Sequence, residues 1–367
     1  MISYGQQHID EKDIRAVVRA LRSPFITQGP EVLRFEKSLA KKSGVRFAVA
    51  VGNGTVALEI AYRAAGIKAG DEVITTPNTF VATSNMLLQI GAKPVFCDIR
   101  EDNYNIDETK IEALVTKNTS AIVPVHFAGR IAEMETINRI AKRHGLMVIA
   151  DGAQVLGATY SGKLSGVHAP LTTLSFHAVK SITTGEGGAI LTNNEKLYRK
   201  LLLLRSHGVS KDKVGFNVMS EFGVNGRLTD IQAALGSSQL EKLASFMKKR
   251  RTIAKTYYKL LSKVSEVVLP SREEKGESSW HLFVIRTKDA KDRLPLYRFL
   301  RKKEIGVNFH YPAVYAHPYY RNLGFRANCS VMDEYAKAAI TIPLHVNLSE
   351  KEIAYVAASI KEFFAKK

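Results

Sequence analysis

The chain has 367 residues, of which 45% are hydrophobic and 24% are charged, a composition that excludes an intrinsically disordered protein. Its 53 Lys and Arg residues against 35 Asp and Glu residues give a formal net charge of +18, which suggests nucleic acid or an anionic membrane as a partner. The excess is uneven, however, because residues 51–200 carry only +1 and residues 201–367 carry +13. The two cysteines, Cys97 and Cys329, are too few for a disulfide framework and lack metal-ligand spacing, so we expect a reduced, cytoplasmic protein with no metal. No hydrophobic run is long enough to span a bilayer.

The first half of the chain alternates apolar segments with helical ones. Strands are predicted at residues 47–51, 73–76, 94–98, 121–125 and 147–151, with helices at 56–65, at 80–88 and around Ile137. Apolar strands separated by helices are typical of a mostly parallel sheet covered on both faces. Residues 171–176 and 189–192 predict two more short strands, joined by a glycine-containing loop as at the edge of such a sheet.

The composition changes after a long helix predicted from about Thr229 to about Arg251. Beyond it, strand-like segments at 267–269, 281–285 and 307–309 accompany a basic helix at 294–303. The sequence therefore predicts an α/β fold with two domains, a large one over residues 1–244 and a smaller α+β domain over residues 245–367.

Two features that follow predicted strands carry groups suited to a charged ligand. Gly52-Asn53-Gly54-Thr55 joins a strand to a helix, where free backbone N–H groups and glycine let a phosphate approach closely. No lysine follows Gly54 and no third glycine is present, so the turn is neither a P-loop nor a Rossmann fingerprint. Asp151 ends another strand at the sheet edge where ligands bind, and its carboxylate can pair with a cationic ring nitrogen. Read alone, each feature is also consistent with a helix cap or a capped turn.

Lys180 lies between a short apolar strand and a glycine-rich loop, in the stretch Ser-Phe-His-Ala-Val-Lys at residues 175–180. A lysine held near the sheet is partly removed from water, which lowers its pKa and makes its amine a nucleophile for carbonyl carbons. A lysine for a Schiff base, an acid for a pyridinium nitrogen and a helix N-terminus for a phosphate are together what pyridoxal phosphate requires. The combination predicts a pyridoxal-phosphate enzyme with Lys180 and Asp151 as its catalytic residues.

Longer stretches resemble a known family. The sequence is similar, from Tyr4 to about Leu348, to the fold-type-I, pyridoxal-phosphate-dependent sugar aminotransferases of the DegT/DnrJ/EryC/StrS group. The most specific stretches are the Ser-Phe-His-x-x-Lys block and the Asn-x-Arg entry of a helix at residues 225–227, and residues 26–30, 75–83, 205–208 and 310–312 add to them. Within the group the chain most resembles the branch that aminates UDP-linked 4-keto sugars for pseudaminic acid synthesis. The resemblance implies transfer of an amino group from glutamate to the C4 ketone of a UDP-linked 4-keto-6-deoxy-N-acetyl-hexosamine.

The resemblance also implies roles for single residues. Lys180 matches the Schiff-base lysine, and Asp151 matches the partner of the pyridine nitrogen. The other cofactor contacts that it implies are with the phosphate, the ring face and the ring hydroxyl: Gly54, Thr55, Ser175, Asn225, Phe80 and Gln154. The substrate contacts that it implies are Tyr4, His177, Arg227, His310 and Tyr311. Asn225 matches a residue that reaches in from a second subunit, which implies a homodimer with shared active sites, and Gly226 stands where the family often has an aromatic residue.

Several alternatives stay open at the level of the sequence. His177 is equally consistent with a packed histidine, and Arg227 with an ion pair to Asp230. A related aminotransferase acting at C3, or on a dTDP- or GDP-linked sugar, fits the same motifs, whereas the related 3-dehydratases have histidine in place of Lys180. A basic nucleic-acid-binding regulator is the remote alternative, since no nucleic-acid-binding motif is present.

Overall fold

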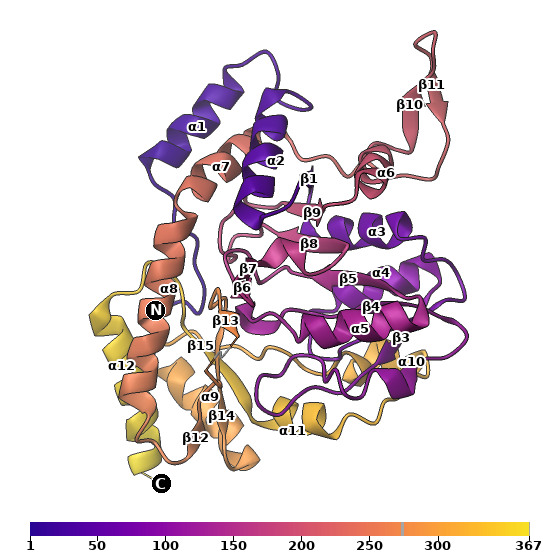
Figure 1. The fold of residues 1–367 in the computed structure, drawn as a ribbon. Helices are drawn as coiled ribbons and strands as arrows, with labels where there is room; N and C mark the ends of the chain where they lie inside the picture. Colours follow the sequence, from indigo (N-terminus) through magenta and orange to yellow (C-terminus); the bar gives the residue numbers. More distant parts are fainter. Residues whose placement is uncertain (273–274, 367) are drawn as a thin grey trace.

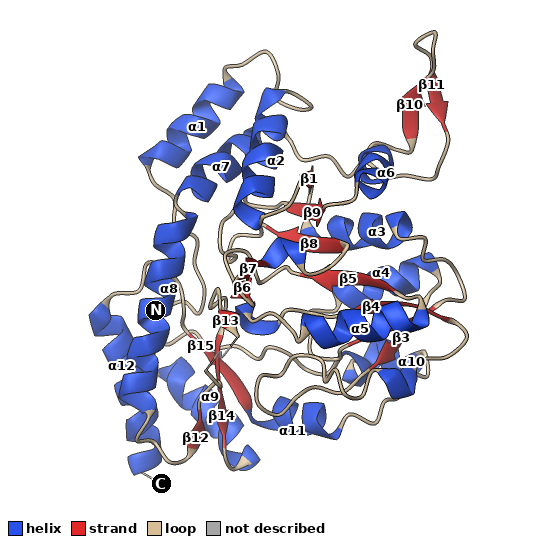
Figure 2. Ribbon diagram, viewed as in Figure 1, coloured by secondary structure: helices blue, strands red, loops and turns tan. Residues whose placement is uncertain are grey.

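The computed structural model describes residues 1–272 and 275–366. Residues 273, 274 and 367, which belong to the predicted small domain, lie outside the described part of the chain. A large sheet with helices on both faces makes up one part of the molecule, and a smaller sheet with its own helices lies beside it (Figure 1). Figure 2 shows the same arrangement with strands in red between layers of blue helices.

The large sheet has seven strands and is mostly parallel, as predicted. Its order is β1 (Phe47–Val51), β9 (Gly188–Thr192), β8 (Leu171–Ser175), β5 (Met147–Asp151), β4 (Thr119–Val123), β2 (Glu72–Thr75) and β3 (Lys93–Phe96). The strands from β8 to β3 are parallel, and β9 is antiparallel to both of its neighbours. The expectation that β8 and β9 form the edge was wrong, because β1 pairs with β9 and is itself the edge strand.

Two apolar cores lie on the two faces of this sheet. Alternate residues of β1 and β5 enter opposite cores, with Ala50 and Ala150 on one face and Val49 and Ile149 on the other. The first face is covered by α2 (Pro30–Ser43), α5 (Met134–His144) and α7 (Asp230–Glu241). The second is covered by α3 (Gly54–Ala64), α4 (Ala82–Ile90) and α6 (Glu195–Arg205). The strands are apolar on both sides for this reason.

The smaller sheet is antiparallel and has its own core. Its strands are β12 (Val267–Val268), β14 (Phe283–Thr287) and β15 (Ala339–Ile342), with α9 (Arg293–Lys302) and α12 (Glu350–Ala365) packed against them. Further helices are α1 (Glu11–Leu21), α10 (Pro318–Asn322) and α11 (Ser330–Ala338). A three-stranded ribbon of β6 (Thr159–Tyr160), β7 (Lys163–Leu164) and β13 (Gly276–Glu277) links the two parts. The division at residues 244 and 245 stays a prediction.

The predicted helix from Thr229 to Arg251 was wrong in one respect, since it is two helices. Thr229 and Gln232 form a capping box that starts α7 where expected, but α7 ends at Glu241 and α8 (Leu243–Leu261) begins after Lys242. The Lys242 ammonium pairs with Asp10 at 2.9 Å and with Asp13, which ties the junction to the start of α1. Leu243 to Met247 of α8 join the core of the large sheet, and Ile253 to Leu261 join the small one.

Two other predicted segments differ from the structure. Residues 307–309 are not a strand, because Asn308 makes only an isolated bridge to Thr341 before the chain turns toward the large sheet. The strand predicted at 121–125 is β4, which ends two residues earlier, at Val123, because Pro124 follows it and has no N–H to donate.

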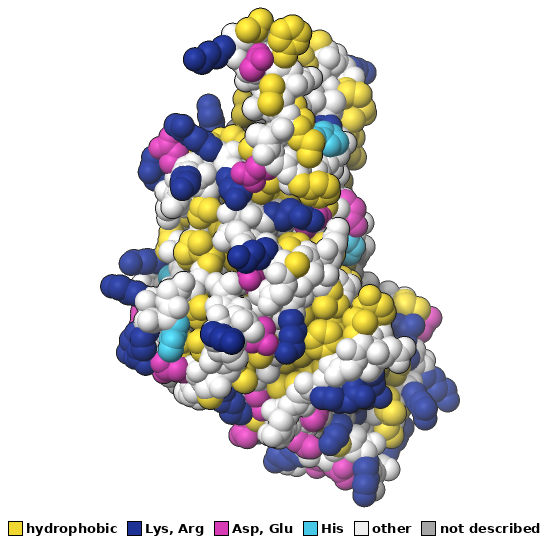
Figure 3. Space-filling view, turned by 90° about the vertical axis from the view of Figure 1, so that its right-hand side faces the viewer, with side chains coloured by type: hydrophobic (Ala, Val, Ile, Leu, Met, Phe, Trp, Pro, Cys, Tyr) yellow, Lys and Arg dark blue, Asp and Glu magenta, His cyan; other side chains and the backbone are white. Residues whose placement is uncertain are grey.

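A hairpin of β10 (Val209–Lys211) and β11 (Asn217–Met219) projects from the large sheet (Figure 1). Its exposed side chains, and those just after it, include five large apolar ones among charged and polar neighbours: Val214, Phe216, Val218, Met219 and Phe222. Figure 3, seen from the hairpin side, shows hydrophobic side chains gathered at this projecting end, while basic side chains are scattered over the rest of the face. Among the described residues no helix is long and apolar enough to cross a membrane. Residues 1–272 and 275–366 also contain no group of three or more His, Cys, Asp or Glu side chains that could hold a metal ion.

Candidate active site

A large cavity lies at the carboxyl edge of the sheet, where the ends of β1, β2, β5 and β8 meet segments from both ends of the chain. Its volume is about 890 Å³. Eleven of the thirteen predicted site residues line it, namely Tyr4, Gly54, Thr55, Phe80, Asp151, Gln154, Ser175, His177, Lys180, His310 and Tyr311. The remaining two, Asn225 and Arg227, are not among its lining residues.

One wall of the cavity is the N-terminus of α3. Asn53 caps the helix by accepting a hydrogen bond from the N–H of Val56 at 2.9 Å, which leaves the N–H groups of Gly54 and Thr55 without an intrahelical partner. A Cβ atom added to Gly54 would lie 3.0 Å from the Ser175 Cβ, so the Ser175 side chain closes directly over the turn. Two free amides, two hydroxyls and the positive end of a helix form a cradle that suits a phosphate.

Asp151 stands at the floor of the cavity, at the end of β5, and is 5% exposed. Its Oδ2 accepts a hydrogen bond from the Thr83 hydroxyl at 2.7 Å, and its Oδ1 accepts one from the N–H of Ala153 at 3.1 Å. Among the described residues no Lys, Arg or His forms an ion pair with it, although a buried carboxylate is costly without a cation. The residue is therefore suited to a cationic group of a ligand, such as a protonated ring nitrogen.

Lys180 is held close to the sheet by the loop that joins β8 to β9. The N–H of Phe176 donates to Gly187 O at 2.8 Å and the N–H of Thr184 donates to Phe176 O at 3.0 Å, which closes the loop around the lysine. Burial lowers the pKa of Lys180 to about 8, against the opposing effect of the nearby Asp151 charge. The amine is thus far more often neutral at pH 7 than that of an exposed lysine, and it can act as a nucleophile.

Aromatic and amide groups surround the position between Asp151 and Lys180. The Phe80 side chain is 60% exposed and lines the cavity, so one face of its ring is available for stacking. Gln154 Nε2 donates to the Tyr311 hydroxyl at 3.1 Å, and its Oε1 accepts from the N–H of Ala128 at 2.7 Å. Tyr4 and His310 have ring centroids 5.5 Å apart on the same side of the cavity.

Asn225 and Arg227 lie on a segment that runs along β1 instead of into the cavity. Asn225 is exposed, and its backbone forms an isolated antiparallel β-bridge with Ser206. The backbone of Arg227 forms another with Val51. The alternative pairing of Arg227 with Asp230 does not occur, because Asp230 accepts from the backbone N–H groups of Gly29 and Glu31. Glycine is favoured at position 226, since an added Cβ would lie 2.9 Å from both Val56 and Ile60 of α3.

The cavity also contains residues that the sequence did not single out. Thr83 holds Asp151, and Glu186 lies 4.0 Å from the Nε2 of His177. His281 and His317 complete the lining from the C-terminal half of the chain. Thr83 falls inside a stretch that carried the family resemblance, whereas no local pattern marked His281.

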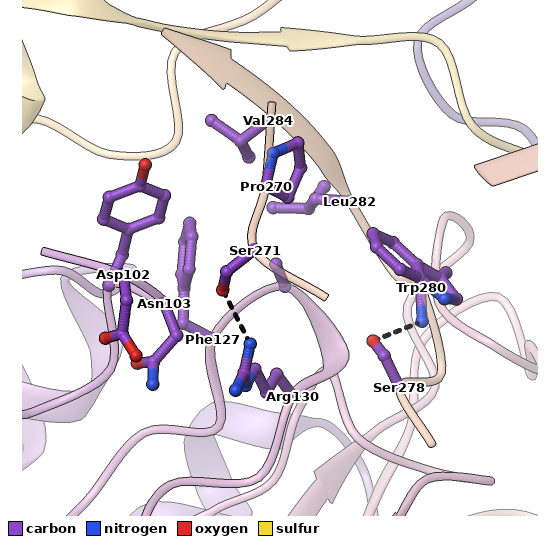
Figure 4. A pocket seen from close by; sticks show the side chains of 12 residues that line it. Asp102, Asn103, Phe127, Arg130, Pro270, Ser271, Ser278, Trp280, Leu282 and Val284 are labelled. Carbon is purple, nitrogen blue, oxygen red and sulfur yellow. Dashed lines mark hydrogen bonds between the residues drawn. The ribbon is translucent and has the colours of Figure 1, made fainter. Parts of the chain in front are cut away.

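A much smaller void, of about 40 Å³, lies between the two parts of the molecule and is shown in Figure 4. Trp280, Leu282 and Phe127 line it, and Arg130 Nη1 donates to the Ser271 hydroxyl at its rim at 2.7 Å. Neither this void nor other cavities of the described chain, of about 530 to 670 Å³, are lined by any predicted site residue, so the large cavity is the candidate active site.

A fold of this kind, with a partly buried lysine, a buried aspartate and a phosphate cradle in one cavity, is that of a fold-type-I aminotransferase. A family model described as the DegT/DnrJ/EryC1/StrS aminotransferase family matches residues 7–361, and the chain belongs to that family. Members depend on pyridoxal 5′-phosphate, which is therefore the cofactor of this protein.

Individual relatives agree along nearly the whole chain. A Campylobacter jejuni protein named UDP-4-amino-4,6-dideoxy-N-acetyl-beta-L-altrosamine transaminase is 39% identical, over 97% of this chain and 96% of its own. The structure of Helicobacter pylori PseC, an aminotransferase of pseudaminic acid biosynthesis, matches with a TM-score of 0.96 and 36% identity, over 100% of both chains. The PLP form of the putative sugar aminotransferase Spr1654 from Streptococcus pneumoniae matches with a TM-score of 0.94 and 30% identity, over 100% of this chain and 99% of that one.

Proposed function

We propose that the protein transfers an amino group from glutamate to the C4 ketone of a UDP-linked 4-keto-6-deoxy-N-acetyl-hexosamine. The observation that carries the reaction type is the meeting of Lys180, Asp151 and the α3 N-terminus in one cavity. The sugar is supported by the names of the Campylobacter and Helicobacter proteins, both more than a third identical to this chain over nearly its whole length.

Lys180 and Asp151 divide the chemistry between them. When bound, pyridoxal 5′-phosphate supplies an electron sink for the carbon that loses its proton. Lys180 Nζ would hold the cofactor between turnovers, and its free amine would take the proton from the donor Cα and later return it. The Asp151 carboxylate keeps the ring nitrogen protonated, since a cation there is the partner that its buried charge lacks. The nitrogen would be carried on the cofactor from the donor, which leaves as a keto acid, to the sugar ketone, whose oxygen leaves as water, and Lys180 would move the proton in the opposite direction.

The other cavity residues bind and orient. We assign the phosphate to Gly54, Thr55 and Ser175, and the ring face to Phe80. We assign the ring hydroxyl to Gln154, whose side chain is held by hydrogen bonds with Ala128 and Tyr311. Tyr4, His177, His310 and Tyr311 are left for the nucleotide sugar, which is larger than the cofactor and needs the outer part of the cavity.

A homodimer completes the site in this proposal. Asn225 is exposed and outside its own cavity, so a phosphate contact by Asn225 has to be made in a second copy of the chain, and we propose the same for Arg227 toward an anionic substrate group. The apolar hairpin residues next to this segment, such as Phe216 and Met219, give it an exposed surface typical of an interface. A cytoplasmic location is consistent with two buried cysteines that are both free thiols.

The alternative is an enzyme of the same family that acts at C3 or on a dTDP- or GDP-linked keto sugar. The direct test is incubation of the purified protein with glutamate and a panel of UDP-, dTDP- and GDP-linked keto sugars, followed by NMR of the products. We expect amination at C4 of the UDP-linked sugar. A product aminated at C3, or formed only from a dTDP- or GDP-linked sugar, would contradict the proposed substrate but not the reaction type.

A further inference from the structure

His281 lies in the active-site cavity, and its ring makes no hydrogen bond to any described residue. The side chain is 5% exposed, it lines the cavity, and its Nδ1 is buried without a partner. The three other buried histidines of the described chain, His126, His310 and His345, each have one ring nitrogen hydrogen-bonded. Buried polar groups in folded proteins are nearly always paired, and Nε2 of His281, unlike Nδ1, is not fully buried, so a ligand in the cavity can supply its partner.

The backbone around His281 is fixed from two sides. The N–H of His281 donates to Ala128 O at 3.0 Å, and Arg250 Nη1 donates to Trp280 O at 3.0 Å and to His281 O at 3.4 Å. Trp280 has a φ of 49°, in the left-handed region that residues other than glycine rarely adopt. The N–H of Trp280 is also bonded to the Ser278 hydroxyl, as Figure 4 shows. Strained backbone held by this many contacts is found where a side chain has to be aimed.

The charges around His281 keep its imidazole neutral. Burial, together with the positive charges of Lys180 and Arg250, holds the pKa of His281 well below its usual range. A neutral imidazole has one N–H donor and one acceptor nitrogen. Its best partner is a neutral group that both donates and accepts, such as a hydroxyl, whereas a carboxylate or a phosphate favours a cation.

The chemistry of the two substrates shows which of them has a hydroxyl that His281 can bind. An amino donor such as glutamate presents carboxylates, while a sugar presents hydroxyls next to its ketone. Lys180, which lines the same cavity as His281, has to reach the reacting carbon of either substrate. A group that meets both His281 and Lys180 therefore lies close to that carbon.

We propose that His281 is a specificity-determining residue that hydrogen-bonds a hydroxyl of the keto sugar beside its reacting carbonyl, an inference that rests on the proposed function. The sugar is in this way oriented by a residue from the C-terminal half of the chain, while the cofactor is held mainly by residues 54–180.

The test compares His281→Phe, which keeps the size of the ring and removes both nitrogens, with His281→Asn, which keeps a donor and an acceptor. The control is His168→Phe, at a half-buried histidine that contacts Lys163 O and lies outside the cavity. The first measurement is the dissociation constant of the aminated UDP-sugar for the cofactor-free protein, by calorimetry. The second is the rate at which glutamate alone changes the visible absorbance of the cofactor-loaded protein.

We expect His281→Phe to raise the dissociation constant roughly 10- to 100-fold, and His281→Asn to recover part of the loss. The rate with glutamate should stay within about threefold of the wild type, because no donor group meets His281. An unchanged dissociation constant in His281→Phe, an equal loss in His168→Phe, or an equal fall in the glutamate rate would each overturn the inference. If the wild-type protein neither binds nor aminates any nucleotide sugar, the proposed function falls and this inference with it; if the wild type does both, only the inference is at stake.

Discussion

Lys180 and Asp151 owe their proposed reactivity to burial more than to residue type. One is a lysine whose pKa falls to about 8 in a closed loop, and the other is a carboxylate with neutral donors and no ion-pair partner among the described residues. The protein has 53 basic residues, and position at the carboxyl edge of the sheet distinguishes Lys180 from the rest.

Replacing Asp151 by Asn should lower kcat at least about 100-fold, because an amide cannot keep the ring nitrogen protonated. The visible absorbance of the bound cofactor should persist, since Lys180 is untouched. The matched variant Thr83→Val keeps the Asp151 carboxylate but removes its 2.7 Å hydrogen bond from Thr83, together with the contacts of the Thr83 hydroxyl with Thr79 Oγ1 and Phe80 O, and should cost about tenfold in kcat. Steady-state kinetics with glutamate and the keto sugar measure both effects. An Asp151→Asn enzyme with wild-type kcat would remove Asp151 from the chemistry.

The pKa of Lys180 predicts how cofactor capture depends on pH. A pKa of about 8 leaves roughly a tenth of the amine neutral at pH 7, compared with well under a thousandth for an ordinary lysine. The rate at which the cofactor-free protein captures pyridoxal phosphate should therefore rise about tenfold per pH unit below pH 8 and level off above it. Stopped-flow absorbance between pH 6 and pH 10 follows this rate. A rise that continued beyond pH 10 would show that the lysine is not desolvated.

At the scale of elements, the sequence predicted helices and strands correctly where the local pattern agrees with the tertiary structure. Strands that are apolar on both faces predicted the parallel sheet, and the Thr229–Gln232 capping box fixed the start of α7. The break at Lys242 was missed because it depends on ion pairs with Asp10 and Asp13, more than 200 residues away. The helical pattern of residues 229–251 does not indicate these long-range ion pairs.

The residues of the candidate site likewise fall into those that the sequence could place and those that it could not. Residues at the ends of predicted strands, such as Asp151, could be placed from the sequence because parallel strands end at one edge. His281 could not, since it reaches the cavity from the smaller sheet through the contacts of its backbone with Ala128 and Arg250. The family resemblance supplied Tyr4 and His310 without explaining how residues 306 positions apart come together; the structure does so through the hydrogen bond from the N–H of Gly306 to Ile2 O.

The hairpin of β10 and β11 and the Asn225 segment give a prediction at this scale. Asn225→Ala should raise the dissociation constant of the cofactor about tenfold without changing the oligomeric state, because it removes one phosphate contact. Phe216→Ser should instead weaken the dimer, since it takes an exposed aromatic ring out of the proposed interface. Cofactor titration and analytical ultracentrifugation separate the two. An unchanged cofactor affinity in the Asn225→Ala dimer would remove Asn225 from the phosphate site.

At the scale of the whole molecule, we relate the net charge of +18 to the attraction of small anionic ligands. The excess charge lies mostly in residues 201–367, whereas the cavity itself is lined by Lys180 and the two acids Asp151 and Glu186. Nucleotide diphosphates, dicarboxylates and the cofactor phosphate are all anions, which a positive field attracts.

Salt should therefore lower kcat/KM for the nucleotide sugar several-fold between about 0.05 and 0.5 M while leaving kcat unchanged, because screening acts on encounter and not on chemistry. Kinetics in NaCl at constant pH test this, with a neutral keto-sugar analogue as the control. A mobility-shift assay at physiological salt should show no sequence-selective binding of DNA or RNA. A tight, sequence-selective shift would support the regulatory alternative instead.

The central claim is that the amine of Lys180 carries the cofactor. Borohydride reduction of the cofactor-loaded protein fixes the bond between the lysine nitrogen and the cofactor carbon, and peptide mass spectrometry then locates it. The account predicts the added mass on the peptide that contains Lys180, and its loss together with the visible absorbance in Lys180→Ala. The added mass on any other lysine, or none at all in a protein that still transaminates, would contradict it.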